Sequence, residues 1–242
     1  MGSLRRWEDD PSRPTPGRAL ADLGRRALAP AVPLWGLVVG TGLLIVGPLD
    51  SLPEEEAVNE ALAAGRTPSL DAVTSVLSNI GATLFIVSAC LVAMATLWWR
   101  TRQWWFAVVP GIAVALQAAV FVTAAAVVGR ERPDVDHLDE APPTSSFPSG
   151  HTGASTAFYL TMAMLAQRIR RPVLRRVATA VCILVPFLVA TARLYRGMHS
   201  PTDVVVGMLN GIVCALLGWH YLRREEDGRR RQTRAYRARP KE

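Results

Sequence analysis

The chain has 242 residues, of which 50% are hydrophobic and 19% charged, and its formal net charge is +7. The charges are crowded into short stretches that leave apolar runs of about 15–25 residues, the length that a helix needs to cross a hydrocarbon layer about 30 Å thick. This distribution excludes a soluble doubly wound sheet, a disordered chain and a disulfide scaffold. Each of the three cysteines lies in an apolar run, so we interpret them as packing residues without a redox or metal role.

Six apolar runs predict six membrane-spanning helices. Within lipid every backbone amide needs an internal partner, and no run alternates as a barrel strand would. In chain order, the predicted spans are residues 31–49, 80–99, 104–128, 149–166, 177–192 and 203–222. We therefore predict an all-α, polytopic membrane protein with a six-helix domain over residues 31–222. A basic N-terminal segment, residues 1–30, precedes this domain, and a basic tail, residues 223–242, follows it.

The basic residues are divided unequally between the loops on the two sides of the predicted spans. Of the 27 lysines and arginines, 22 fall in the N-terminal segment, the turn after the second span, the loop after the fourth span and the tail. Basic loops stay on the cytoplasmic side of a membrane, so both termini are predicted to be cytoplasmic. We interpret the basic tail as an orientation signal that also attracts anionic lipid, and not as a nucleic-acid arm.

The first outer connection, residues 50–79, begins with an acidic run at residues 54–56. Leu70, Val73 and Leu77 follow at helical spacing, with Ser69 as the expected N-cap. The pattern predicts a short helix that lies on the outer surface or extends the second span. Two interpretations of this helix stay open, a wall of a substrate entrance and a simple connector.

Arginines on the outer side lie next to the ends of the predicted spans. Arg130 and Arg132 follow the third span, Arg193 ends the fifth, and Arg196 comes shortly after it. The planar fork of donors on arginine fits phosphate oxygens, so we predict a phosphate site there. The alternative is a set of exposed loop charges.

Two helix starts on the same outer side carry histidines. Residues 148–151, Pro-Ser-Gly-His, open the fourth span, where free N–H groups and the helix dipole favour an anion. Before the sixth span, His199 precedes Ser200 as N-cap and Asp203 in the first turn. This geometry predicts that the Asp203 carboxylate holds one ring nitrogen of His199 and leaves the other nitrogen free to attack.

Arg132-Pro133, the Pro-Ser-Gly-His run and Arg193 with His199 and Asp203 resemble, in order and spacing, the three-part signature of the type 2 phosphatidic acid phosphatase superfamily. The resemblance covers nearly the whole chain apart from its two ends. It implies that His199 is the nucleophile, which takes the phosphoryl group as a phosphohistidine, and that Asp203 orients and stabilises its ring. It implies that His151 protonates the leaving oxygen and then activates water.

The same resemblance implies that the oxygens of the phosphate are held without a metal or cofactor. Its phosphate-binding residues are Arg132, Ser149, Gly150 and Arg193. Two positions depart from the pattern, because Ala125 stands where the family has lysine and Ala192 where it has serine. Loss of one transition-state donor typically lowers the rate by about 10²–10³. Arg130 is the predicted substitute for the missing ammonium, and an impaired or repurposed site is the alternative.

A site at the ends of four spans lies at the depth of lipid head groups. We therefore predict a multi-pass cell-membrane phosphatase that acts on a lipid phosphate or diphosphate at the extracytoplasmic face. An undecaprenyl-type polyprenyl diphosphate is ranked first, and phosphatidic acid, phosphatidylglycerol phosphate and phosphotransfer to another acceptor are alternatives. A catalytically impaired scaffold or transporter is the alternative from another class. The predicted partners are the substrate and the bilayer, with no nucleic acid and with the oligomeric state left open.

Overall fold

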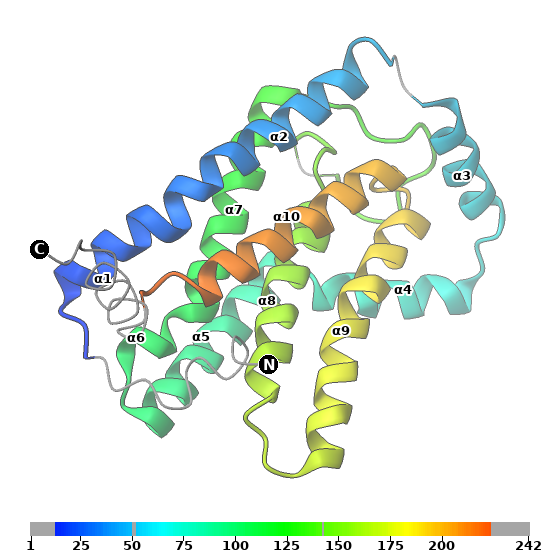
Figure 1. Ribbon diagram of the computed structural model, residues 1–242. Coiled ribbons are helices and arrows are strands. Elements are labelled where there is room, and N and C mark those ends of the chain that lie inside the picture. Colours follow the sequence, from blue (N-terminus) through cyan, green and yellow to red (C-terminus); the bar gives the residue numbers. More distant parts are fainter. Residues whose placement is uncertain (1–12, 50–51, 142, 224–242) are drawn as a thin grey trace, which may run out of the picture.

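The computed structural model describes residues 13–49, 52–141 and 143–223, and no strand occurs in these ranges. Figure 1 shows the helices as an elongated bundle with α3 and α4 forming an arm at one end. In chain order they are α1 (Pro16–Leu23), the π-helical turn η1 (Gly24–Leu28), α2 (Ala29–Val46), α3 (Pro53–Ala64), α4 (Pro68–Ile80), α5 (Thr83–Thr101), α6 (Trp104–Ala107), α7 (Val109–Val128), α8 (Gly150–Ala166), α9 (Pro172–Tyr195) and α10 (Pro201–Trp219). The prediction of an all-helical chain is confirmed for these ranges.

Five helical segments in the described ranges are long and apolar enough to cross a membrane. They are residues 16–46, 83–101, 104–128, 172–195 and 201–219, and they match the first, second, third, fifth and sixth predicted spans. The first begins well before its predicted start, because α1 and η1 continue into α2. The chain is therefore a multi-pass membrane protein.

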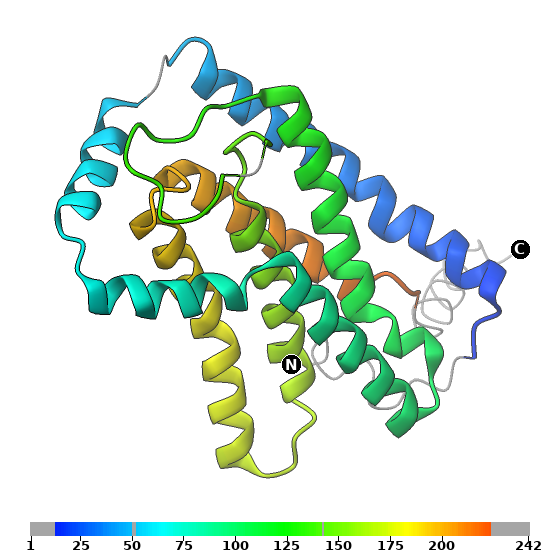
Figure 2. The same ribbon diagram turned by 180° about the vertical axis from the view of Figure 1, so that it is seen from behind.

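The run predicted as the fourth span is α8, which has 17 residues and a length of about 25 Å. Several hydroxyl side chains lie along it. Ser155 and Thr156 donate to the carbonyl of Thr152, and Thr161 donates to that of Ala157. Since these hydroxyls are satisfied inside the helix, α8 can be buried, and it packs against α7, α9 and α10 (Figure 2).

Glycines let α8 and α10 approach backbone to backbone. A Cβ atom added at Gly207 would lie 2.6 Å from the carbonyl oxygen of Ser149, and one added at Gly211 would lie 2.5 Å from that of Gly153. Small residues four apart allow membrane helices to pack this closely. The close contact brings the first turns of the two helices side by side.

Gly211→Ala is expected to destabilise the protein by about 1–3 kcal/mol, because the added methyl group meets backbone that cannot move aside. The matched control is Gly40→Ala in α2, where an added Cβ has nothing within 4 Å. Since alanine is the better helix former by about 1 kcal/mol, the control is expected to be neutral or stabilising. Thermal unfolding in detergent measures both, and equal midpoints would contradict the close packing.

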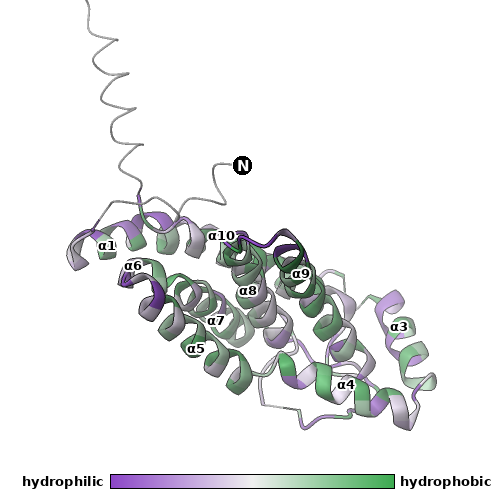
Figure 3. Cartoon of the chain, turned by 90° about the horizontal axis from the view of Figure 1, so that it is seen from below, coloured by the Kyte–Doolittle hydropathy of each residue, from purple (hydrophilic) through white to green (hydrophobic). Residues whose placement is uncertain are grey.

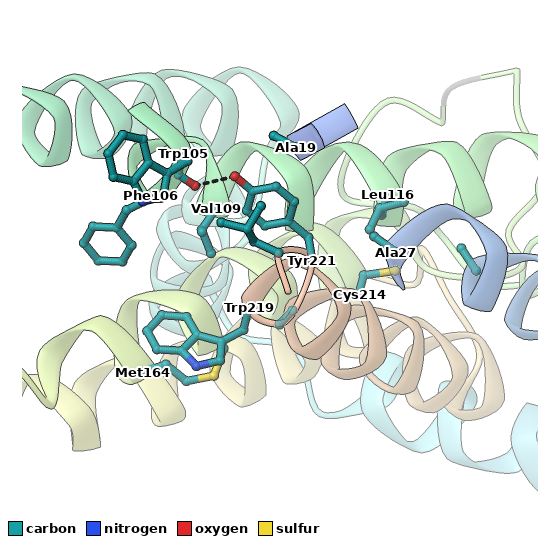
Figure 4. Close-up of a cluster of buried hydrophobic side chains, with 13 residues drawn as sticks. Ala19, Ala27, Trp105, Phe106, Val109, Leu116, Met164, Cys214, Trp219 and Tyr221 are labelled. Atoms are coloured by element: carbon teal, nitrogen blue, oxygen red, sulfur yellow. Dashed lines mark hydrogen bonds between the residues drawn. The ribbon is translucent and has the colours of Figure 1, made fainter. Parts of the chain in front are cut away.

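The end of the bundle far from the starts of α8 and α10 holds a large apolar cluster (Figure 4). Here the hydroxyl group of Tyr221 donates to the carbonyl of Trp105 at 2.5 Å, which joins the end of α10 to the start of α6. By contrast, α5 presents large side chains outward, with Leu84 80% exposed and Val92 66% exposed. Figure 3 shows hydrophobic residues along α5 and α7, as expected for helices that face lipid.

The 50–79 connection forms two helices instead of the single short helix predicted. The predicted N-cap, Ser69, is wrong: Thr67 caps α4 and accepts from the N–H of Leu70. The reason is that Pro68 takes the first helical position, so the cap is the residue before it.

The apolar residues of α4 point outward, and Val73 is 54% exposed. The buried face of α4 carries Thr74 and Ser78. Thr74 accepts a hydrogen bond from Arg196, and Ser78 accepts one from Arg193, both at the end of α9. In a water-soluble protein the apolar face would be the buried one. The reversed arrangement fits a helix that has lipid outside and a polar site inside.

Candidate active site

The first turns of α8 and α10 are joined through the main chain. The backbone N–H of Ser149, the N-cap of α8, donates to the carbonyl of Asp203 at 2.9 Å. Ser200 caps α10 as predicted, and its N–H donates to the Asp203 carboxylate at 2.9 Å, so this helix start is a capping box. These contacts place His151 and His199, one beside each cap, at a shared cavity.

The cavity has a volume of about 340 Å³, a basic end and an apolar wall. Its basic end is lined by Arg132, Gly150, His151, Arg193 and His199, which are five of the eight residues predicted for the site. Its wall comes from α5 and α7 and is lined by Ile86, Val87, Val114, Ala118, Phe121 and Val122. A cavity of this kind fits a phosphate group that is attached to an apolar chain.

The backbone at Gly150 lies close to the wall. A Cβ atom there would lie 2.7 Å from the ring of Phe121, so a larger residue would displace this aromatic side chain. Ser149 is fully buried beneath it, and its hydroxyl accepts from the N–H of Thr152. The start of α8 therefore reaches the cavity through its backbone, as the predicted anion site requires.

The imidazole of His199 is oriented by a main-chain carbonyl. Its Nδ1 lies 2.8 Å from the carbonyl oxygen of Ser146 and 3.7 Å from Oδ2 of Asp203. The prediction that the carboxylate itself holds the ring is corrected, because 3.7 Å is too long for a hydrogen bond. The cap explains the difference, since Oδ2 accepts from the N–H of Ser200 instead.

A carbonyl oxygen can only accept, so Nδ1 of His199 carries the proton and Nε2 keeps its lone pair. Burial lowers the pKa of His199, against the opposing charge of Asp203, and this keeps the ring neutral at neutral pH. A neutral imidazole with a free Nε2 at a cavity is the form that a nitrogen nucleophile needs.

Arg193 is held at the cavity by a carboxylate that the sequence analysis did not select. Its Nη1 donates to Asp139 at 2.7 Å and to Ser78 at 2.8 Å. The other oxygen of Asp139 pairs with Arg196 at 2.7 Å. Although burial opposes it, pairing with Arg196 and Arg193 lowers the pKa of Asp139, which therefore stays ionised. Nε of Arg193 is buried without a hydrogen-bond partner in the described ranges.

Arg132 ties the loop before α8 to the residue that precedes His199. Its Nη1 donates to the carbonyl of Met198 at 2.7 Å. Burial lowers the pKa of Arg132, against the charge of Asp203, but a guanidinium stays protonated at neutral pH. Arg132 and Arg193 therefore place two positive charges at the same cavity.

Arg130 lies elsewhere, contrary to its predicted place beside the phosphate. Its guanidinium contacts Oδ1 of Asp203 at 2.6 Å, Oε2 of Glu55 at 2.8 Å and the hydroxyl group of Thr202 at 2.8 Å. It does not line the cavity that contains the histidines. The carboxylates of Asp203 and Glu55 hold its guanidinium group in this position.

Three polar residues near the site were missed by the sequence analysis: Glu55, Asp139 and Gln117. Gln117 lies on α7, lines the cavity and has a buried side-chain nitrogen without a partner in the described ranges. In the sequence, Gln117 could have been recognised as a polar amide within an apolar run. Glu55 belongs to the acidic run at the start of α3, and Asp139 to the polar loop between Arg132 and Ser149.

The two positions that depart from the family pattern are buried. Ala125 is 5% exposed on α7 and does not line the cavity, and Ala192 is fully buried on α9 beside Arg193. Among the described residues, no three His, Cys, Asp or Glu side chains are grouped so that they could hold a metal ion.

Comparisons with known proteins identify the family. The model of the PAP2 superfamily matches residues 104–227, just over half of the chain. A decaprenylphosphoryl-5-phosphoribose phosphatase from Mycolicibacterium smegmatis is 40% identical over 111 residues, which are 44% of this chain and 53% of that protein. The chain thus matches about half the length of this curated relative.

Two solved structures share the fold. A transmembrane PAP2-type phosphatidylglycerolphosphate phosphatase from Bacillus subtilis has a TM-score of 0.67 at 20% identity, covering 78% of this chain and 92% of that one. LpxE from Aquifex aeolicus has a TM-score of 0.53 at 23% identity, covering 67% and 92%. With a family model that spans α6 to α10 and a bundle shared with PAP2 membrane proteins, the chain belongs to the PAP2 superfamily.

Proposed function

We propose that the chain is a metal-independent membrane phosphatase that hydrolyses a lipid phosphate or diphosphate through a phosphohistidine at His199. One observation carries the proposal: His151, His199, Arg132 and Arg193 meet at one cavity whose remaining wall is apolar. The phosphatase names of the similar proteins from Mycolicibacterium smegmatis and Bacillus subtilis support it.

The first step transfers the phosphoryl group to the enzyme. Nε2 of His199 attacks phosphorus, the bond from phosphorus to the leaving oxygen breaks, and His151 gives that oxygen a proton. Phosphoryl transfer depends mainly on positioning and on stabilising the charge of the phosphate oxygens. Arg132, Arg193 and the backbone N–H groups at Ser149 and Gly150 are the proposed donors.

The second step releases inorganic phosphate. His151, now neutral, takes a proton from a water molecule, whose oxygen attacks phosphorus while the bond to Nε2 breaks. Phosphorylation leaves the His199 ring positively charged. The Ser146 carbonyl at 2.8 Å and the Asp203 carboxylate at 3.7 Å both stabilise that charge. Asp203 is therefore assigned an electrostatic role.

The proposed substrate has a polyprenyl chain as its apolar part. Among the candidate substrates, a polyprenyl diphosphate is ranked first. Its support is the apolar wall formed by α5 and α7, together with the decaprenyl chain in the name of the relative from Mycolicibacterium smegmatis. Phosphatidic acid, phosphatidylglycerol phosphate and transfer to an acceptor other than water stay alternatives.

We also propose six spans over residues 31–222, with both termini in the cytoplasm of the cell and the cavity on the extracytoplasmic side of the cell membrane. The distribution of the 27 basic residues supports this orientation. The buried position of α8 among α7, α9 and α10 supports its assignment as the fourth span, in addition to the five long apolar helices.

Purified protein in detergent micelles is expected to release phosphate from at least one member of a lipid panel. The panel contains a polyprenyl diphosphate, phosphatidic acid and phosphatidylglycerol phosphate, each assayed with and without EDTA. Release is expected to be unaffected by EDTA, and vanadate is expected to inhibit it because vanadate imitates the phosphoryl group in transfer.

Two outcomes would contradict the proposal. No phosphate from any lipid would favour a scaffold or transporter. Loss of activity with EDTA would show that a metal ion takes part.

A further inference from the structure

One oxygen of Asp203 belongs to a largely buried network of charges. Arg130 bridges Asp203, at 2.6 Å, and Glu55, at 2.8 Å. The side chains are 10% exposed for Arg130, 9% for Glu55 and 0% for Asp203. Glu55 comes from α3, a helix in the outer connection that lies far from the site in sequence.

Glu55 also binds the start of α10 directly. Its Oε1 accepts from the backbone N–H of Thr202 at 2.6 Å, and its Oε2 lies 3.0 Å from the hydroxyl group of Thr202. A carboxylate at a helix N-terminus is stabilised by the free N–H groups and by the helix dipole. Glu55 therefore fixes α3, Arg130 and the first turn of α10 to one another.

Both oxygens of Asp203 are engaged. Oδ1 accepts from Arg130 and Oδ2 from the N–H of Ser200, which leaves the carboxylate 3.7 Å from Nδ1 of His199. Without Arg130, this fully buried carboxylate would lack its charged partner. It could then turn toward the ring and compete with the Ser146 carbonyl that orients His199.

We infer that Arg130 and Glu55 are positioning residues, which hold Asp203 in place and thereby keep His199 directed at the phosphate. The inference rests on the proposed function and adds to it, since it makes α3 part of the active site. It also assigns Arg130 a role other than phosphate binding. The charges of Asp203 and Glu55 raise the pKa of Arg130 against the effect of burial, so the bridging guanidinium is permanently charged.

The test uses substitutions that break the contacts among Glu55, Arg130 and Asp203 while keeping side chains of similar size. In Glu55→Gln and Arg130→Lys, kcat is expected to fall roughly 10- to 100-fold, the usual effect of losing an outer partner that orients a reacting group. KM and the inhibition constant of inorganic phosphate are expected to stay within about twofold, because the groups that contact phosphate are unchanged. The matched control is Glu56→Gln, the same change at the next residue, which is exposed and expected to keep wild-type kcat.

Arg130→Ala adds a second readout, because added guanidinium ion is expected to restore part of its kcat. A merely structural defect would not respond to the ion. Thermal unfolding and size-exclusion profiles show whether each variant is folded, and Glu55→Gln and Arg130→Lys keep the test decisive if Arg130→Ala misfolds.

Wild-type kcat in folded Glu55→Gln and Arg130→Lys would overturn the inference. A weaker inhibition by phosphate in Arg130→Lys would also overturn it, because it would make Arg130 a phosphate ligand. Either result would leave the proposed function intact as long as the wild-type protein releases phosphate and His199→Ala does not. Inactivity of the wild-type protein on the whole panel would instead reject the proposed function.

Discussion

His199→Ala is expected to abolish phosphate release, with kcat lower by about 10⁴-fold or more, because no other nitrogen takes the place of the attacking Nε2. The fold should tolerate the change, since the capping box at Ser200 and Asp203 does not use the imidazole. Phosphate release from the preferred lipid, measured beside thermal unfolding, checks both expectations.

The matched control is His220→Ala, at the far end of α10, which is expected to keep wild-type turnover. Retention of activity by folded His199→Ala would reject the phosphohistidine mechanism. Loss of activity in both variants would show that the histidines support α10 and do not act in the reaction.

His151→Ala is expected to separate the two chemical steps. With a lipid phosphate, whose leaving oxygen needs a proton, turnover should fall by about 10²–10⁴-fold. With p-nitrophenyl phosphate, the leaving group departs without an acid, so His199 is still phosphorylated. Hydrolysis of the phosphohistidine is slow because no base activates water, and the phosphoenzyme should accumulate.

Mass spectrometry of the peptide that contains His199 measures this intermediate. A phosphorylated peptide in His151→Ala that is absent from the double variant His151→Ala/His199→Ala is the expected result. Phosphate on another residue would assign a different nucleophile. Equal turnover of lipid phosphate by His151→Ala and wild type would remove His151 from the mechanism.

The sequence was informative where one segment determines its own structure. Apolar runs predicted the long helices, and the start of α10 at the Ser200 N-cap was correct because it depends on a few consecutive residues. Burial of α8 was harder to predict, since its hydroxyls are satisfied within the helix. The outward apolar face of α4 depends on surroundings that periodicity cannot show.

Contacts between distant segments account for the errors at the site. Arg130 lies two residues from Arg132, yet its position is set by Glu55, which is 75 residues away in sequence. The carbonyl that orients His199 belongs to Ser146, 53 residues earlier. Main-chain groups carry no signature in residue identity, so sequence spacing favoured Asp203 as the ring partner.

The bond between the Ser149 N–H and the Asp203 carbonyl, at 2.9 Å, has a consequence for how such proteins diverge. It fixes the spacing of the two histidine-bearing turns through main-chain groups that every amino acid except proline can supply. The apolar wall that we propose contacts the hydrocarbon tail belongs to α5 and α7 instead. Substitutions on those two helices can therefore change which hydrocarbon chain the protein prefers. The spacing of the turns that carry His151 and His199 stays the same.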